Sequence, residues 1–117
     1  MISWGRLTYC LAAISKLPNG SGSEISFFLN GKSYMIIHYR DRVTLTYYPD
    51  DFETSGRYME RRYSSIEEAG NARDFGFRLK DEWENVTELL CNPDFDECPL
   101  DVILEDYRKC PGVSGGR

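Results

Sequence analysis

His38 is the residue with the most versatile chemistry in this sequence, and it is the single histidine. An imidazole side chain can serve as a general base or bind a metal near neutral pH. The pattern around it predicts a position in mid-strand opposite Leu45, where local spacing holds no acid beside it. A nucleophile and base pair with Cys10 is the alternative. We interpret His38 as a structural residue with a satisfied hydrogen bond and predict that the protein is not an enzyme.

Motifs that bind phosphates, metals or substrates at fixed spacings do not occur in the sequence. It contains neither G-x-x-x-x-G-K nor G-x-G-x-x-G, and no metalloprotease, nucleophile-elbow or calcium-loop pattern. Adjacent carboxylates such as Glu67 and Glu68 diverge around a helix. Four cysteines form no C-x-x-C pair, which disfavours zinc: Cys10, Cys91, Cys98 and Cys110. We predict reduced thiols, no cofactor, and no catalytic or metal-binding residue.

The stretch between residues 94 and 106 is the strongest candidate for a functional surface. It carries six carboxylates and no basic residue: Asp94, Asp96, Glu97, Asp101, Glu105 and Asp106. Asp101 and Glu105 are four residues apart, so they share one face of a predicted helix whose apolar residues face the other way. Such a surface can attract a basic protein and mimic phosphate groups. A solvated helix face is the alternative.

From charge alone, we predict that five of these carboxylates contact a partner: Asp94, Asp96, Glu97, Asp101 and Glu105. Tyr39 and Tyr48 are the predicted aromatic anchors, because aromatic side chains often dominate binding at interfaces. The formal net charge is −5. Residues 1–60 carry six basic and six acidic side chains, whereas residues 61–117 carry eight and thirteen, so the whole excess of five lies in the second half.

This acidity argues against nucleic acid as the partner, because phosphate groups would be repelled at long range. Arg57, Arg61 and Arg62 on a predicted strand are the observation in favour of it, since arginines and aromatic residues on a sheet can bind single strands. The sequence pattern of RNA-binding sheets is absent, however. We therefore predict a basic protein partner and no nucleic acid.

The chemistry-bearing residues lie on a predicted α+β scaffold. Apolar residues at helical spacing between residues 5 and 17 predict an N-terminal helix. β-forming runs, separated by turn residues, then predict four strands at residues 25–29, 34–39, 43–48 and 57–63. Consecutive strands followed by helices indicate a four-stranded antiparallel meander, with the C-terminal helices packed on one face of the sheet.

Two hairpin turns predict the strand register. The Asn30-Gly31 turn pairs Phe27 with Tyr34, and a two-residue turn at Asp41-Arg42 pairs His38 with Leu45. Both turns place the same apolar residues on one face: Ile25, Phe27, Leu29, Tyr34, Ile36, Val43, Leu45 and Tyr47. The opposite face is too apolar to be fully solvated, so we expect a helix, a loop or a partner to cover part of it.

Three helices are predicted after the sheet. Ser64 or Ser65 caps a short helix, which Gly70 and then Asp74-Phe75-Gly76 break or bend. A longer one follows, because its apolar residues recur at helical spacing: Leu79, Trp83, Val86 and Leu90. The last helix begins near Pro99, and the Gly- and Ser-rich tail at 111–117 is expected to fray. The sequence shows no linker, no export signal and no membrane-length apolar run, so we predict one cytoplasmic domain, 1–117, away from membranes.

Two neighbouring segments carry a resemblance to a known class of proteins. Residues 63–68 read Tyr-Ser-Ser-Ile-Glu-Glu, and residues 74–86 read Asp-Phe-Gly-Phe-Arg-Leu-Lys-Asp-Glu-Trp-Glu-Asn-Val. Together they resemble bacterial immunity proteins of contact-dependent and other polymorphic toxin systems, in which a Ser-capped helix precedes a Trp-containing helix behind a small sheet. The resemblance implies a stoichiometric inhibitor of a cognate toxin, often a nuclease.

Three other functions compete with this interpretation. A phage-type inhibitor of a host nucleic-acid enzyme would use the same acidic surface on a different target. A small enzyme would use His38 with a cysteine or a carboxylate. A subunit or adaptor would cover the apolar second face of the sheet by forming a homodimer.

Overall fold

The structure, a computed structural model, describes residues 1–109, so Cys110 and the tail predicted to fray lie outside the described residues. Its elements follow one another in this order: α1 (Trp4–Ser15), β1 (Ser23–Leu29), β2 (Lys32–His38), β3 (Val43–Tyr48), α2 (Phe52–Ser55), β4 (Met59–Tyr63), α3 (Ile66–Asn71), α4 (Leu79–Glu82), a 3-10 turn (Trp83–Asn85), β5 (Thr87–Asn92) and α5 (Leu100–Lys109). The predicted α+β class and the N-terminal helix are confirmed.

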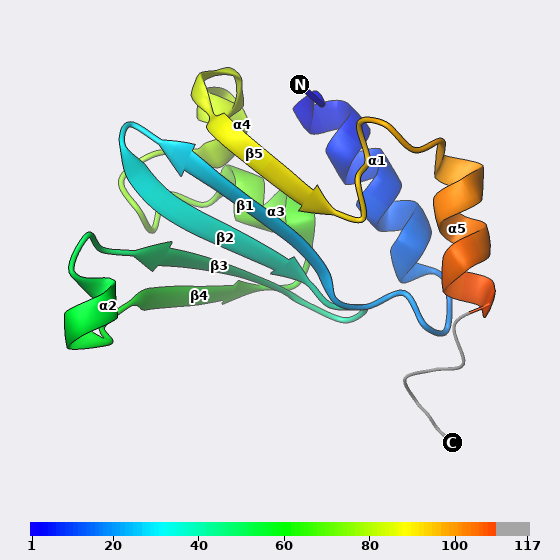
Figure 1. Cartoon of the computed structure of the whole chain (residues 1–117), viewed down its shortest axis with the longest axis horizontal. Helices are drawn as coiled ribbons and strands as arrows, with labels where there is room; N and C mark the ends of the chain where they lie inside the picture. Colours follow the sequence, from blue (N-terminus) through cyan, green and yellow to red (C-terminus); the bar gives the residue numbers. More distant parts are fainter. Residues whose placement is uncertain (110–117) are drawn as a thin grey trace.

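The sheet has five antiparallel strands in the order β4-β3-β2-β1-β5, so the prediction of four strands is wrong (Figure 1). The missed strand, β5, lies where one long helix up to Leu90 was predicted. Helical structure ends at Asn85 instead, and the chain becomes extended at Val86. The β-branched residues Val86 and Thr87 favour a strand. By pairing with β1, β5 also satisfies backbone groups of β1 that would otherwise lie unpaired at the edge of the sheet.

The register prediction is confirmed for the first hairpin and wrong for the second. Phe27 pairs with Tyr34, as the Asn30-Gly31 turn predicts. His38, however, pairs with Val43 rather than Leu45, because the second loop spans residues 39–42 and is closed by a hydrogen bond from the Tyr39 amide to the Arg42 carbonyl oxygen at 2.8 Å. The error is two residues, so every side chain stays on its predicted face.

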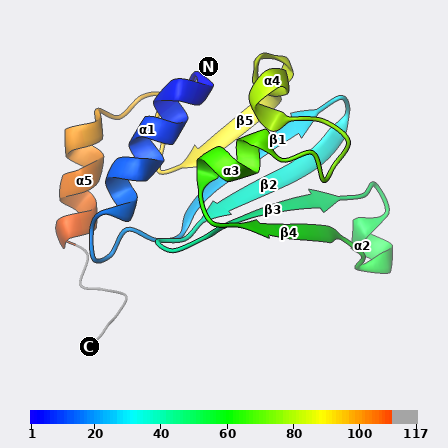
Figure 2. The same cartoon turned by 180° about the vertical axis from the view of Figure 1, so that it is seen from behind.

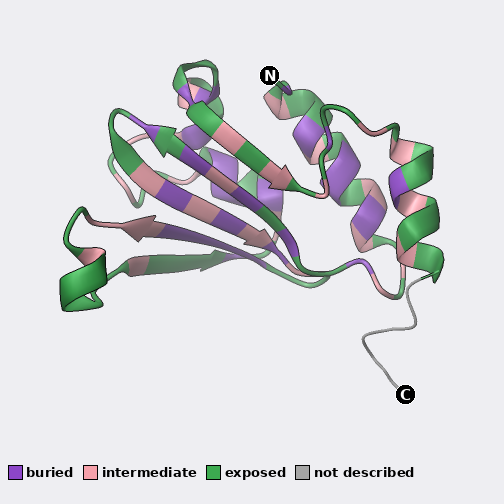
Figure 3. Ribbon diagram, in the orientation of Figure 1, coloured by how far each residue is buried: buried purple, intermediate pink, exposed green. Residues whose placement is uncertain are grey.

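One face of the sheet is covered by helices and forms the core. Figures 1 and 2 show α1 and α3 on the same side of the sheet. Along β1 and β2 buried residues alternate with more exposed ones (Figure 3), as expected for strands with one buried face. The predicted core residues are buried except Tyr47, which is half-buried: Ile25, Phe27, Leu29, Tyr34, Ile36, Val43 and Leu45.

No helix within residues 1–109 covers the middle of the other face (Figure 1). Its apolar side chains include the half-buried Met35 and Ile37 and the exposed Leu90, which is 72% accessible. At one end of the sheet, α2 meets this face, and the rings of Phe52 and Tyr48 lie 4.9 Å apart. In the described part of the chain, the only helix that meets this face does so at one end, while Thr44 and Thr46 at its centre are nevertheless buried, each with 4% of its surface exposed.

The predicted Ser-capped helix is present as α3. The Ser65 hydroxyl accepts a hydrogen bond from the Glu68 amide at 3.1 Å, and the Glu68 carboxylate accepts one from the Ser64 amide at 2.6 Å. These bonds satisfy amides at the start of the helix, and the hydrogen bonds that the Ser64 amide and hydroxyl donate to the Glu68 carboxylate lower its pKa. Gly70 lies inside α3, which ends one residue later at Asn71. Gly70 is buried, and a Cβ atom there would come 2.2 Å from the Trp4 ring, so the packing leaves no room for a side chain.

Trp83 joins the sheet to the N-terminal segment. Its indole N–H donates a hydrogen bond to the Ile2 carbonyl oxygen at 2.9 Å. Its ring lies edge-on to Phe27 of β1 at 5.6 Å and to Trp4 of α1 at 5.2 Å. The chain therefore packs an aromatic cluster behind the strands. Among residues 1–109, no helix has the length and apolar character that crossing a membrane requires.

Candidate partner-binding surface

The loop between β5 and α5 turns its carboxylates outward around one buried aromatic residue. Phe95 is only 2% exposed, whereas its neighbours Asp94 and Asp96 are exposed. The Asp94 carboxylate accepts hydrogen bonds from the amides of Asp96 and Glu97, both at 3.1 Å. An Asp side chain that binds the following amides in this way favours a tight turn. The loop is therefore ordered by its own residues, and its charged groups face solvent.

Helix α5 positions the remaining carboxylates. Ile103 is buried in the core, while Asp101 and Glu105 are exposed, as the helical spacing predicts. The helix is attached to the sheet through Tyr107, whose hydroxyl lies 2.8 Å from the Ser23 hydroxyl of β1. The Asn19 side chain also donates to the Tyr107 carbonyl oxygen at 3.3 Å. These bonds hold α5 at one end of the sheet.

We call the six exposed carboxylates of this loop and helix the acidic surface: Asp94, Asp96, Glu97, Asp101, Glu105 and Asp106. Two of them have a cationic neighbour. Asp96 lies 3.8 Å from the N-terminal ammonium group, and Glu105 lies 3.6 Å from Arg108. The other four have no ion-pair partner among residues 1–109. Exposed ion pairs are weak and screened by salt, so the surface keeps a strongly negative potential.

The charge of the acidic surface reaches the end of β5. A hollow of about 180 Å³ lies there, and apolar and acidic residues line it together: Ile2, Leu89, Leu90, Cys91, Asp94, Asp96 and Glu97. The pKa of the Cys91 thiol is raised to about 11, first by burial and then by the negative charges of Asp94 and Asp96. The thiolate is disfavoured because it would add a negative charge beside existing ones.

The two predicted aromatic anchors lie at opposite ends of the sheet. Tyr39 follows directly after β2, at the end where β5 finishes, and its ring lies 4.0 Å from the Arg42 guanidinium. Tyr48 pairs with Ser33 at the other end, about 20 Å away at the usual rise per residue of a strand. Both tyrosines are half-buried rather than fully exposed. The structure thus exposes all five predicted carboxylates on one loop and the helix that follows it, and it leaves the two tyrosines at opposite ends of the sheet.

His38 is buried, with 4% of its surface exposed, and its Nδ1 atom has no hydrogen-bond partner among residues 1–109. The prediction of a satisfied hydrogen bond is therefore not met. The residue lines a cavity of about 160 Å³ together with side chains that include Ser15, Ser65 and Glu67. Burial lowers the pKa of His38, so its imidazole is neutral at pH 7. No thiol or carboxylate in the described residues is hydrogen-bonded to it.

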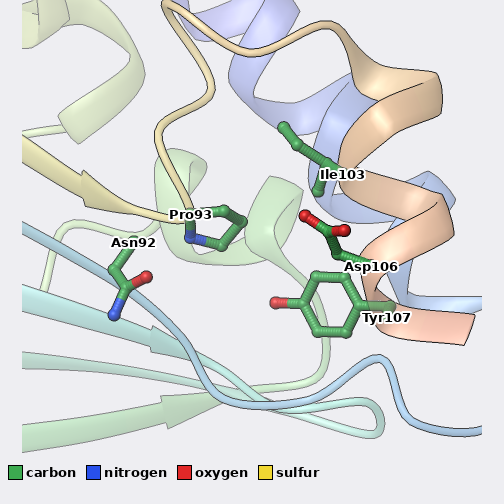
Figure 4. Close-up of a pocket in the computed structure, with 5 residues that line it drawn as sticks. All are labelled: Asn92, Pro93, Ile103, Asp106 and Tyr107. Carbon is green, nitrogen blue, oxygen red and sulfur yellow. The ribbon is translucent and has the colours of Figure 1, made fainter. Parts of the chain in front are cut away.

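A pocket that the sequence did not predict lies beside the acidic surface, between the end of β5 and α5 (Figure 4). Its volume is about 230 Å³, and it is lined by Asn92, Pro93, Ile103, Asp106 and Tyr107. Asp106 belongs to the acidic stretch but not to the five carboxylates predicted to contact a partner. The exposure of Asp106 follows from helical spacing, whereas the opposite wall depends on β5, which the sequence analysis missed.

Comparison of the chain with protein-family models, with curated proteins and with solved structures finds no match. Within residues 1–109, no group of three His, Cys, Asp or Glu side chains is placed to hold a metal ion. Cys10, Cys91 and Cys98 are free thiols, and Cys10 is buried in the core.

Proposed function

We propose that this protein binds a basic partner protein in a stoichiometric complex and thereby neutralises it, as an immunity protein neutralises its toxin. One observation carries the proposal: six exposed carboxylates of one sign lie on a loop and a helix that are ordered before any partner binds. A surface of this kind accelerates encounter with a positively charged protein and rejects negatively charged ones. The place of action in this proposal is the cytoplasm.

A nuclease is the toxin that fits this chemistry best. Its active-site groove must be positively charged to bind phosphate groups, and carboxylates can occupy the same groove in place of phosphates. The resemblance of residues 63–86 to immunity proteins is a second reason for the proposal, and its Ser-capped helix is present as α3, whereas Trp83 lies in a 3-10 turn and not in the helix that the resemblance implies. Inhibition of a host nucleic-acid enzyme by a phage-type protein would use the same surface and is the alternative.

The test is a survival assay in a bacterial host. The product of the adjacent reading frame is expressed with and without this protein, and complex formation is measured at several salt concentrations. We expect the neighbouring product to kill, this protein to restore growth, and the association rate to fall as salt screens the charges. A harmless neighbour, or rescue without a complex, would contradict the proposal.

Charge reversal identifies the binding surface in the same assay. Asp101→Lys combined with Glu105→Lys changes the charge of the acidic surface by four units, and we expect it to weaken rescue and slow association at least tenfold. Asp50→Lys combined with Glu53→Lys is the matched control, since both residues are exposed and lie near α2 at the other end of the sheet. Equal loss in the two double variants would show that only net charge matters.

A further inference from the structure

The pocket between β5 and α5 has walls of contrasting chemistry. Asn92 and Pro93 form the wall at the end of the strand, and Ile103 adds an apolar side chain from the helix. Figure 4 shows the Asp106 carboxylate and the Tyr107 ring on α5, opposite Pro93 and Asn92. The pocket therefore combines apolar surface, one aromatic ring and one carboxylate, with an amide at its edge.

We infer that this pocket receives one arginine side chain of the protein partner. The guanidinium group would pair with the Asp106 carboxylate and lie against the Tyr107 ring, and its aliphatic stem would contact Pro93 and Ile103. Arginine fits these groups because its planar guanidinium forms paired hydrogen bonds to carboxylates and also stacks on aromatic rings. The Asn92 side-chain oxygen can accept a further hydrogen bond from it.

Charge and size both select this occupant. The pocket opens onto the acidic surface, which repels anions and attracts cations before contact. Its volume of about 230 Å³ is below the roughly 300 to 1,000 Å³ of sites for drug-sized ligands, so it suits a single side chain. An uncharged apolar side chain would fill the space but would bury part of the Asp106 carboxylate without a partner, which is unfavourable.

The walls of the pocket are held in place before binding. Tyr107 uses its hydroxyl for the contact with Ser23, so the orientation of its ring is fixed by a hydrogen bond to the sheet. Its backbone carbonyl oxygen accepts a second bond, from Asn19. Little side-chain entropy remains to be lost when a ligand enters, which favours recognition of even one residue. The arginine pocket rests on the proposed function only for the identity of the partner that supplies the arginine.

The test uses the full chain and three short peptides, followed by NMR of the backbone and side-chain amides. The probes are acetyl-Gly-Arg-Gly-amide, the same peptide with lysine, and the same peptide with citrulline, which has the shape of arginine without its charge. We expect saturable shifts at Asn92 and Tyr107 with the arginine peptide, binding at least several-fold weaker with lysine, and none with citrulline.

Two variants locate the interaction. Asp106→Asn removes the carboxylate from an exposed position. We expect it to lower the affinity for the arginine peptide about tenfold, the loss typical of one charge-assisted pair. Asp50→Asn is the matched control, because it removes the same charge from an exposed position outside both the pocket and the acidic surface, and it should change the affinity less than twofold.

The inference is overturned by absence of a saturable shift at Asn92 and Tyr107, by equal binding of the citrulline or lysine peptide, or by equal effects of the two variants. These results do not depend on the toxin assay. If the arginine peptide binds as expected but no basic protein forms a complex, the pocket stands and the proposed function falls. If a complex with a basic protein forms while the arginine peptide does not bind, the proposed function stands and the arginine pocket falls.

Discussion

The helix-covered face of the sheet and the acidic surface use their side chains in opposite ways. On the covered face, aromatic and aliphatic groups are almost fully buried, and the indole N–H of Trp83 is paired with the Ile2 carbonyl oxygen. On the acidic surface, Phe95 and Ile103 supply buried anchors, while all six carboxylates remain in solvent. The proposed function therefore predicts that stability and partner binding depend on different residues, so that each can be changed without the other.

The largest expected effect is on stability and comes from Trp83. Trp83→Ala removes a buried aromatic side chain and leaves the Ile2 carbonyl oxygen without its donor, so we expect the free energy of unfolding to fall by about 3 to 5 kcal/mol. Urea denaturation followed by circular dichroism measures the change. Trp83→Phe keeps part of the ring contact with Phe27 but not the hydrogen bond, and should cost less.

The matched change on the acidic surface is Asp101→Lys, which should alter the free energy of unfolding by no more than about 0.5 kcal/mol, as is usual for exposed substitutions. A loss of stability as large as that of the tryptophan variant would show that the two regions are not independent. If Trp83→Ala left the free energy of unfolding unchanged, the packing of the covered face would not be the main source of stability.

The second effect is a dependence of stability on pH that belongs to the covered face. Burial holds the pKa of His38 below its unfolded value of about 6.5, so below that pH the unfolded chain binds a proton that the folded chain does not. Stability contributed by the neutral imidazole is present above pH 6.5 and is lost as the pH falls, with a slope of at most about 1.4 kcal/mol per pH unit.

His38→Gln removes this proton and leaves the carboxylates unchanged, so the difference between the two proteins isolates the histidine. We expect the urea midpoint of the wild type to fall more than that of the variant between pH 7.5 and 5.5. Glu67 and Arg40 line the same cavity as His38 and are present in both proteins. Parallel pH profiles would mean that His38 is protonated as easily in the folded protein as in the unfolded chain.

The sequence predicted those parts of the fold that depend on local pattern. Alternation and the Asn30-Gly31 turn determine the pairing of β1 with β2, and i,i+4 spacing places Asp101 and Glu105 on one exposed face. The register predicted for the second hairpin was wrong because the chain closes its loop through a hydrogen bond from the Tyr39 amide to the Arg42 carbonyl oxygen, and no turn motif in the sequence predicts that bond.

Strand β5 and the pocket beside it could not be predicted in the same way. Trp83, Val86 and Leu90 have helical spacing, yet Leu90 is exposed, because pairing with β1 outweighs the local pattern. The pocket wall formed by Tyr107 depends on its bond to Ser23, 84 residues earlier in the sequence. Contacts of such separation are set by the tertiary packing of the whole chain rather than by spacing, so the candidate site was predicted only as far as its exposed charges.

The smallest expected effect measures how far the negative potential of the acidic surface extends toward the covered face. Cys91 pairs with Ile25 of the core-facing set, but its pKa of about 11 is raised partly by Asp94 and Asp96. Removing those charges with Asp94→Asn and Asp96→Asn should lower the pKa and increase the rate of alkylation by iodoacetamide at pH 8.5 about two- to threefold.

The effect is modest because burial, which the substitutions leave in place, is the larger cause of the shift. Mass spectra of digested protein give the rate at Cys91 separately from the other thiols, and Asp101→Asn serves as the control. Asparagine keeps the side-chain oxygen that accepts the amides of Asp96 and Glu97, so the loop should hold its turn. If the rate at Cys91 does not rise, the thiol is governed by burial alone, and the potential of the acidic surface acts outward on solvent and on a partner.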